Sequence, residues 1–446
     1  MSSLIPRPSS VVILLVALVT GCSSIPTPAG PMATPTRLST PTFVAMGPTP
    51  KPETPGIEPG QAITLTLWTT EGLAPDGETC PAPCEGTPAG QVLSQQLAAF
   101  LADHPNVHIQ TLLKKPGGTG GLFDFLQTAS AVAPATLPDL MILDAADLPK
   151  AAQAGPIQPL DDVVGAAAAD LFPFARALAT VNGRLMGMPY IVSVEHVAYD
   201  PTRLEAAPLT WTEVISAGVR FAFPAGESAH ADTLISLYLS IGGTLTDASG
   251  APHLEVAPLI EMLRSLETAR QAGITTNATQ VKSAEDTWAA FRSGTPLAVV
   301  SAERYLADRT ALGAVAAGPL PGWKAPAPSL GSAWVWVLVT RDPVRAPLAQ
   351  QLLRHLTAPE NLGHWSHAAA VLPARRSALA TWETLSEAPD PYLPFLQELL
   401  EKAVARPPAA VYTAIAPALR QAVEDVLLGR ATPETAAAAA VRNVRP

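Results

Sequence analysis

The sequence is poor in aromatic residues, in charge and in cysteine. Of its 446 residues, 5% are aromatic and 15% are charged, and three are cysteines. The 28 basic residues are scattered along the chain and are outnumbered by 38 acidic ones, which leaves a net charge of -10. A nucleic-acid partner needs a stripe of positive charge that displaces counterions, so we expect none here. After residues 11–19 the sequence also has no apolar run long enough to cross a membrane.

Motifs of enzymes and cofactor sites are missing or incomplete. The sequence has no G-x-S-x-G elbow of a serine hydrolase. In the segment KKPGGTGG the Lys114 and Lys115 pair precedes the glycines and no G-K-[ST] follows, so a phosphate-binding loop is not expected. His364 and His367 lie three residues apart without a third ligand in the sequence, and a solvated helix face explains them better than a metal site. We therefore expect no metal and no cofactor.

The first 21 residues have the features of a signal peptide. One cation, Arg7, precedes an apolar run over residues 11–19 that is too short for a mature membrane helix. The run closes in LVTGC, which resembles the bacterial lipobox. That resemblance implies that Cys22 is diacylated, that residues 1–21 are removed, and that two or three acyl chains hold the protein on a membrane. An ordinary secretory signal with an incidental cysteine is the alternative.

Residues 22–60 predict a tether rather than a folded segment. Proline, threonine, serine, alanine and glycine dominate this stretch, and large apolar residues are few. Such a composition cannot bury enough surface to offset the entropy lost on ordering, and its prolines favour extended polyproline II stretches. We expect a disordered stalk that holds a body of about 385 residues, enough for two domains, away from the lipid surface.

Cys80 and Cys84 remain once Cys22 is assigned to lipid. A structural zinc site would need two further ligands at suitable spacing, and none stands out in the sequence. A redox-active pair would normally have the spacing C-x-x-C, which is one residue shorter. Two close cysteines in an oxidising compartment therefore favour a disulfide that closes a small loop.

The apolar pattern of the body predicts alternating strands and helices, which indicates a parallel α/β sheet. In such sheets ligands bind beyond the carboxyl ends of the strands. Strands are predicted at 63–68, 107–113, 140–143, 188–198, 297–300 and 334–340. Helices are predicted at 92–101, 122–132, 234–241, 259–269 and 287–292. From residue 346 onward the periodicity predicts an almost wholly helical chain.

Several short segments between Ile63 and Leu428 occur in a recognisable order, although no single one is specific. They are ITLTLWTT, LPDLMILDAADLPKAAQAGPIQPLDD, VNGRLMGMPYIVSVEHVAYDPTRL, PLTWTEV, IGGTLTD, AAFRSGTPLAVVSAERY, GPLPG, GSAWVWVLVT and APENLGHWSHAAAVLPAR. Their order and spacing resemble those of the bacterial extracellular solute-binding proteins of family 1, the maltose- and oligosaccharide-type receptors of ABC importers.

This resemblance implies an α/β fold of the periplasmic-binding-protein-like type II, with two lobes joined by a hinge and a ligand cleft between the lobes. The backbone would cross between the lobes about three times, near residues 192–196, 301–303 and 333–338. The N-terminal lobe would comprise residues 61–192 and 303–334, and the C-terminal lobe residues 193–302 and 335–446. A ligand that touches both lobes would stabilise the closed form by its differential affinity.

Candidate ligand-binding residues follow partly from the strand ends and partly from the resemblance. Trp68, Thr70 and Asp144 lie at the carboxyl ends of predicted strands, although Trp68 can equally be a core residue and Asp144 can equally cap a helix. Alternation puts Ser193 and Glu195 on one face near the first crossing, where a carboxylate is hard to explain as core. Aromatic residues near the crossings complete the set: Tyr190, Tyr305 and Trp334.

The function implied by the resemblance is capture of a small solute, by family default a sugar or oligosaccharide, and its delivery to the permease of an ABC transporter. No enzymatic activity is expected. The protein would act outside the cytoplasm as a monomer, held to the cell membrane only through Cys22, with permease subunits as partners. The low aromatic content is unusual for an oligosaccharide binder, so a non-sugar polar solute or a sensor partner is an alternative. A lipid-anchored hydrolase is a weaker one, because it would need two carboxylates at a defined separation.

Overall fold

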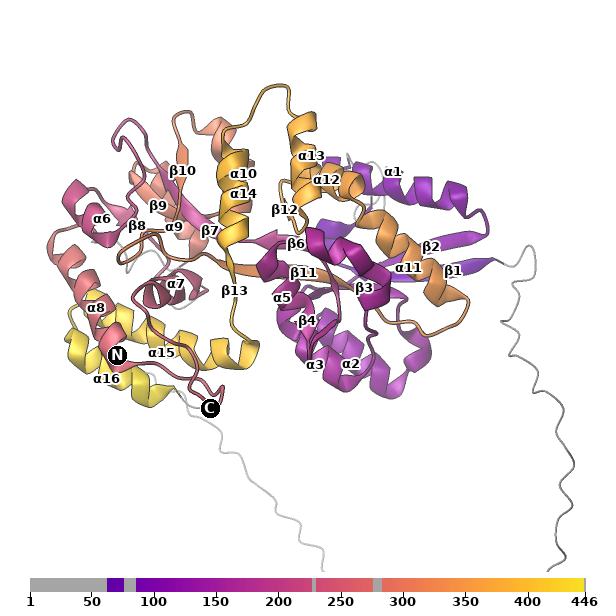
Figure 1. Ribbon diagram of the computed structural model, residues 1–446, viewed down its shortest axis with the longest axis horizontal. Coiled ribbons are helices and arrows are strands. Elements are labelled where there is room, and N and C mark those ends of the chain that lie inside the picture. The colour runs from indigo at the N-terminus through magenta and orange to yellow at the C-terminus, as the bar shows by residue number, and fades with distance from the viewer. Residues whose placement is uncertain (1–61, 76–85, 227–229, 276–282, 445–446) are drawn as a thin grey trace, which may run out of the picture. The chain divides into compact units, whose positions relative to one another are not determined.

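The computed structural model describes residues 62–75, 86–226, 230–275 and 283–444 (Figure 1). The predicted signal peptide and tether, with Cys22, and the pair Cys80 and Cys84 lie outside these residues. The described part of the chain contains no helix that is both long and apolar enough to cross a membrane. It forms an α/β body built on two β-sheets and one short hairpin, β4 (Thr180–Val181) with β5 (Arg184–Leu185).

The larger sheet has seven strands in the order β12-β6-β11-β3-β1-β2, and β13 pairs with the start of β11. Strand β1 pairs in parallel with β2 and β3, whereas β11 runs antiparallel to both β3 and β6. The strands are β1 (Ile63–Thr69), β2 (Val107–Leu113), β3 (Leu140–Asp144), β6 (Met188–Ser193), β11 (Leu330–Leu338), β12 (Leu372–Pro373) and β13 (Val404–Ala405). The predicted strands at 63–68, 107–113 and 140–143 and their parallel sheet are confirmed.

Helices cover both faces of this sheet, with α1, α11 and α12 on one face and α2, α3 and α5 on the other (Figure 1). Parallel strands covered on both faces are apolar throughout, and residues 140–142 of β3 are accordingly 0% exposed. The helices of this lobe are α1 (Pro88–Asp103), α2 (Leu122–Val132), α3 (Leu148–Ala154), α4 (Asp161–Val164), α5 (Pro173–Ala179), α11 (Arg345–Leu356), α12 (Pro359–Ala368) and α13 (Arg376–Leu385).

The smaller sheet has four strands in the order β10-β7-β9-β8, with β7 antiparallel to both of its neighbours. Its strands are β7 (Glu195–Tyr199), β8 (Phe221–Ala222), β9 (Leu297–Ser301) and β10 (Ala316–Gly318). The helices of this lobe are α6 (Trp211–Ala217), α7 (Asp232–Ser240), α8 (Val256–Gln271), α9 (Ala284–Arg292), α10 (Ala302–Asp308), α14 (Tyr392–Lys402), α15 (Ala409–Leu427) and α16 (Pro433–Asn443). Each lobe therefore has its own sheet and helices, as expected of a two-lobe α/β fold.

The chain passes between the two sheets at places that the sequence predicts only in part. Val194 alone separates β6 from β7, so the first predicted crossing, near residues 192–196, is confirmed. The second and third are wrong, because Ser301 pairs with Glu195 inside the smaller sheet and β11 lies wholly in the larger one. The return to the larger sheet occurs between β10 and β11, over residues 319–329.

The predicted lobe boundaries at 302/303 and 334/335 change for the same reason. Strand β10, at residues 316–318, pairs with β7 in the smaller sheet, although the prediction placed 303–334 in the N-terminal lobe. Residues 335–338 of β11 pair with β3 in the larger sheet, although the prediction placed them in the C-terminal lobe. Apolar periodicity predicts where a strand lies in the sequence but not which strand it pairs with. Pairing depends on hydrogen bonds between residues far apart in the chain.

Two short strands interrupt the region that the periodicity predicts as helical. Strands β12 and β13 have two residues each, and a two-residue strand gives no readable alternation. Nevertheless β13 matters for the site, because it pairs with Leu330 and Gly331 of β11 and so fixes the residue that follows it, Arg406.

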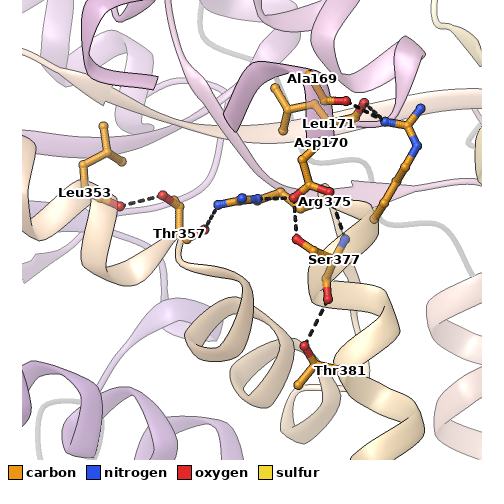
Figure 2. Close-up of polar contacts among 9 residues, drawn as sticks. Ala169, Asp170, Leu171, Leu353, Thr357, Arg375, Ser377 and Thr381 are labelled. Carbon is orange, nitrogen blue, oxygen red and sulfur yellow. Dashed lines mark hydrogen bonds and ion pairs between the residues drawn. The ribbon is translucent and has the colours of Figure 1, made fainter. Parts of the chain in front are cut away.

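A partly buried ion pair joins Arg375, the residue before α13, to the 3-10 helix η4 (Gly165–Asp170), as Figure 2 shows. The Arg375 guanidinium donates to Asp170 at 2.7 Å and to the Thr357 carbonyl at 2.6 Å. Ser377 adds a backbone N–H at 3.0 Å to the same carboxylate. Burial opposes ionisation of Asp170, but the hydrogen bonds from Ser377 and Arg375 outweigh it and hold its pKa below the usual value. We assign this network to packing, because its charges are matched.

Candidate functional site

A cavity of about 200 Å³ lies at the end of β3, beside the start of β11 and the segment after β13. We call it the hinge cavity. Its lining includes four polar residues, Asp144, Thr180, Ser332 and Arg406. Every other lining residue is alanine, proline or leucine, so the rest of the wall is apolar and has no aromatic ring. The carboxyl end of a strand, where Asp144 stands, is where α/β sheets bind ligands.

Arg406 extends from the hinge cavity to Asp232, the first residue of α7. Its Nε donates to one carboxylate oxygen at 3.1 Å and its Nη2 donates to the other, so the pair is bidentate. The side chains are 20% and 6% exposed, respectively. Burial lowers the pKa of Arg406, but the charge and hydrogen bonds of Asp232, with smaller contributions from Tyr412 and Asp144, together raise it above the usual value. The guanidinium also lies 5.4 Å from the centre of the Tyr412 ring.

Glu195, the first residue of β7, lies beside this ion pair. Its Oε2 accepts a 2.6 Å hydrogen bond from the Thr233 hydroxyl, and its backbone carbonyl accepts one from Ser329 at 2.5 Å. Burial and the nearby Asp232 charge raise the pKa of Glu195 to about 7. Burial and the like charge thus disfavour the ionised form of this carboxyl.

Glu303, at the start of α10, adds a further carboxylate to this region. Its side chain hydrogen-bonds with Ser193 of β6 and its charge acts on Glu195. Burial raises its pKa. Its Oε1 is buried and has no hydrogen-bond partner within the described part of the chain. A buried carboxylate oxygen without a partner is costly, and such atoms are uncommon in folded proteins.

Three of the predicted site residues lie in this region. Asp144 lines the hinge cavity and also caps the 3-10 helix η3 (Ala145–Asp147), with Oδ1 accepting from the Ala146 N–H at 2.9 Å. Both interpretations of Asp144 therefore hold at once. Ser193 and Glu195 meet through Glu303, one residue to either side of the first crossing.

Two aromatic candidates lie in the core instead. Trp68 is 4% exposed and packs edge-on against Phe125, with ring centres 6.4 Å apart. Tyr190 is 1% exposed and stacks on Trp365 at 4.8 Å. Trp68 thus fits its interpretation as a core residue, and contact of either ring with a ligand stays a prediction.

The remaining candidates lie away from the hinge cavity. Tyr305 is 4% exposed and lines a different cavity, of about 580 Å³, between α10 and α14. Thr70 lines a third, of about 470 Å³, at the ends of β1 and β2. Trp334 pairs with Asp144 in register, but strand alternation puts it on the same face as Trp336, which packs against Tyr190. None of the three lines the hinge cavity.

Sequence reasoning missed Arg406, Asp232 and Thr233. One signal was present for Arg406, since it directly precedes Pro407 and Pro408 in a stretch predicted as helical. Two consecutive prolines are incompatible with the middle of a helix. The sequence could therefore have predicted that Arg406 lies in a connecting segment rather than in a helix. Asp232 and Thr233 gave no signal, because the start of α7 reaches Glu195 only through the tertiary fold.

The site therefore presents carboxylates, hydroxyls and one guanidinium at the junction of the two sheets. These groups form hydrogen bonds with a polar solute and need no metal ion to do so. Within the described residues, no group of three His, Cys, Asp or Glu side chains is placed to hold a metal ion.

Solved structures of sugar-binding proteins share the fold. The sugar-binding protein MalE from Xanthomonas citri matches with a TM-score of 0.69 and 19% identity, over 85% of this chain and 96% of that one. The cyclic alpha-maltosyl-1,6-maltose binding protein from Arthrobacter globiformis matches with a TM-score of 0.68 and 18% identity, over 86% and 98%. The GacH receptor of Streptomyces glaucescens matches with a TM-score of 0.62 and 18% identity, over 85% and 97%. At these identities the likeness establishes the periplasmic-binding-protein fold of type II.

The sequence has no significant match among curated proteins. Residues 95–390, more than half of the chain, match the family model described as bacterial extracellular solute-binding protein. A solute-binding protein holds its ligand without transforming it, which confirms the prediction that the chain is not an enzyme. The chain belongs to the family of bacterial extracellular solute-binding proteins.

Proposed function

We propose that this protein binds a sugar or oligosaccharide at the hinge cavity and delivers it to the permease of an ABC transporter. One observation carries the proposal: Arg406, in the wall of the hinge cavity, is bonded to Asp232 of the other lobe, next to the Thr233 that donates to Glu195. Asp144 ends a strand of the larger sheet, whereas Glu195 begins a strand of the smaller one. Arg406 lines the cavity beside Asp144 and is paired with the lobe that carries Glu195 through Asp232.

This placement supports a hinge mechanism. A solute that hydrogen-bonds with Asp144 and with Glu195 joins two separate sheets, so its binding energy favours the conformation in which both are within reach. Only the difference in affinity between the open and closed forms shifts their populations. A permease that recognises the closed form then receives loaded receptor in preference to empty receptor.

The choice of a sugar is supported by the chemistry of the site and by the fold neighbours. Carboxylate and guanidinium groups satisfy the many hydroxyls of a sugar with charge-assisted hydrogen bonds. Neighbours of the same fold bind maltose in Thermotoga maritima and maltotriose in Thermus thermophilus. The small alanine and proline walls of the hinge cavity favour a solute that is held mainly by polar contacts.

The proposal includes an extracytoplasmic protein held to the cell membrane by lipid on Cys22, acting as a monomer. The LVTGC segment supports the anchor, and the Pro- and Thr-rich stretch at 22–60 supports a tether. A Cys22→Ser variant grown with an alkyne-labelled fatty acid should lose the label and leave the membrane fraction, while a Cys80→Ser variant keeps both. Equal labelling of the two variants would contradict the anchor.

Ligand binding is tested by thermal unfolding of the full chain with maltose, maltotriose and unrelated small solutes. A ligand at a hundred times its Kd adds about 2.7 kcal/mol to the free energy of unfolding. Asp144→Asn should weaken the response to a binding sugar about tenfold, because the amide replaces a charged acceptor. Glu205→Gln is the control, since Glu205 is exposed. No shift with any sugar would contradict the proposed function.

A further inference from the structure

The cavity of about 580 Å³ that Tyr305 lines is separate from the hinge cavity. We call it the Tyr305 cavity. Its wall is formed by α10, β10 and the start of α14, together with the segments that directly precede β10 and α14. Among the described residues, none lines both cavities. Because the hinge cavity has only about 200 Å³, the Tyr305 cavity has room for a larger ligand.

Tyr305 brings an unused hydroxyl to this cavity. The residue is 4% exposed, and its ring packs against those of His196 and Tyr392, with ring centres 5.1 and 4.7 Å away. Its hydroxyl has no hydrogen-bond partner among the described residues, and it is not one of the fully enclosed polar atoms. Since Tyr305 lines the cavity, this hydroxyl opens onto the cavity space. The hydroxyl of a buried tyrosine usually has a partner, and here a ligand can supply it.

The charges in the wall of the Tyr305 cavity are matched. Of the described residues that line it, only Arg309 and Asp390 are charged. Arg309 donates from Nη1 to Oδ1 at 2.8 Å and from Nη2 to Oδ2, so the pair is bidentate. The side chains are 22% and 17% exposed, which leaves part of each open to a ligand. A charged ligand would bring an unmatched charge into this partly buried place, so the wall favours a neutral polar ligand.

Aromatic rings give the Tyr305 cavity an apolar surface that the hinge cavity lacks. Tyr305, Tyr392 and Phe395 line it, whereas no aromatic residue of the described chain lines the hinge cavity. The rings of Tyr392 and Phe395 have centres 5.8 Å apart, and Phe395 is only half-buried. Such rings pack against the C–H faces of a sugar ring, which are its apolar surface.

The edge of the smaller sheet adds backbone groups to the same cavity. Strand β10 is the outermost strand of that sheet, and its outer edge has no strand partner within the described residues. Ala316 and Ala317 of this strand line the cavity. An edge strand presents unpaired N–H and C=O groups, and alanine side chains leave room to reach them. These groups are donors and acceptors at fixed positions for a ligand with hydroxyls.

We propose that the Tyr305 cavity is a second binding site of this protein and that its ligand is an uncharged sugar. Phe395 and Tyr392 would pack against the sugar ring, while the Tyr305 hydroxyl and the Arg309 and Asp390 pair bond its hydroxyls. Matched charges, aromatic rings and an unpartnered hydroxyl together select this class. The proposal goes beyond the proposed function and does not depend on it, because the two cavities share no described residue.

Fluorine NMR of the full chain, labelled with 3-fluorotyrosine, reports on the cavity directly. The sequence has six tyrosines, and the resonance that is missing from a Tyr305→Phe variant belongs to Tyr305. Glucose, maltose, maltotriose, trehalose and sucrose are titrated in turn, with glucose 6-phosphate and glucosamine as charged probes. At least one uncharged sugar should shift the Tyr305 resonance. It should shift it equally in an Asp144→Asn variant, in which the hinge cavity is impaired.

Isothermal titration calorimetry with the same uncharged sugar measures the contribution of each residue. Tyr305→Phe removes one hydrogen-bonding group and should weaken binding at this site about fivefold. Phe395→Ala removes a ring face and should weaken it about tenfold. Leu428→Ala is the control, because Leu428 is an apolar residue that is 47% exposed and lines neither cavity. If Phe395→Ala fails to fold, Tyr305→Phe, which loses a single oxygen atom, still decides.

The outcomes distinguish this site from the hinge cavity. Loss of the Tyr305 shift in Asp144→Asn would show one site at the hinge cavity, which overturns the second site and leaves the proposed function standing. A shift that persists there, with no effect of Asp144→Asn on any sugar, would support the second site and overturn the proposed function. A response to the charged probes alone would overturn the uncharged class, and no response to any probe would overturn the second site.

Discussion

Neighbouring residues of β7, Glu195 and His196, lie in opposite environments. Glu195 contacts Thr233 and lies beside the ion pair of Asp232 and Arg406. His196 is 0% exposed among the rings of Tyr305, Tyr392 and Phe395. Strand alternation sends consecutive side chains to opposite faces, so one strand separates a polar face from an aromatic face.

The two faces differ in how completely their polar atoms are paired. On the aromatic face, His196 Nε2 bonds with the Tyr392 hydroxyl at 2.8 Å and Nδ1 bonds with the Val197 carbonyl at 3.0 Å. Both ring nitrogens thus have partners. On the polar face, Glu303 Oε1 has no hydrogen-bond partner among the described residues, and Arg406, which acts on Glu195, is bonded to Asp232. Buried polar atoms without a partner are uncommon in folded proteins.

The largest expected change in stability comes from removing the cation of the polar face, Arg406. Arg406→Ala leaves Asp232, 4% exposed, without its partner, and should lower the free energy of unfolding by about 3 kcal/mol. Arg264→Ala is the matched control, because its pair with Glu434 is exposed and should be worth less than about 1 kcal/mol. Urea denaturation at pH 7 measures both. Equal losses in the two variants would mean that Arg406 and Asp232 gain nothing from burial.

The second effect is a pair of opposite pH dependences. Burial and Asp232 raise the pKa of Glu195 from 4.5 to about 7, so its contribution to stability is full below pH 4.5 and is lost as the pH rises to 7. Burial lowers the pKa of His196 from 6.5 to about 4, so its contribution is full above pH 6.5 and is lost as the pH falls to 4. Between pH 4.5 and 6.5 the two contributions oppose each other in the wild type.

Substitutions separate these contributions. Relative to wild type at each pH, Glu195→Gln should gain stability between pH 4.5 and 7, and His196→Gln should gain stability between pH 6.5 and 4, each by up to about 3 kcal/mol. The measurement is the free energy of unfolding in urea at four pH values across this range. Parallel curves for all three proteins would show that neither face holds a perturbed group.

The smallest effects come from single hydroxyls on the two faces. Tyr392→Phe leaves Nε2 of a fully buried histidine unpaired and should cost about 2 kcal/mol. Thr233→Val removes one donor from Glu195, which water can partly replace, and should cost about 1 kcal/mol. Thermal unfolding of the two variants at pH 7 compares them. A larger loss of stability for Thr233→Val than for Tyr392→Phe would contradict the view that hydrogen bonds are more complete on the aromatic face than on the polar face.

The sequence predicts a site residue only where the residues next to it in the chain already show that it is unusual. Glu195 was identified because a carboxylate in a buried strand contradicts the surrounding apolar pattern, and it lies in the charged region of the site. For the aromatic candidates Trp68, Tyr190 and Tyr305, the residue type gave no such contradiction. An aromatic residue fits a core and a ligand site equally well, and only the fold shows that Trp68 and Tyr190 pack in the core whereas Tyr305 also lines a cavity. The ion pair of Asp232 and Arg406 could not be predicted, because the two residues lie 174 positions apart in the sequence.

The sequence by itself determined the α/β class, the main strands and helices, the place of the first crossing and the solute-binding family, because these depend on local periodicity and on the order of motifs. The tertiary structure alone decided which sheet each later strand joins and which charges meet at the hinge. Those outcomes depend on hydrogen bonds and Coulomb interactions between residues far apart in the chain, which leave no trace in local pattern.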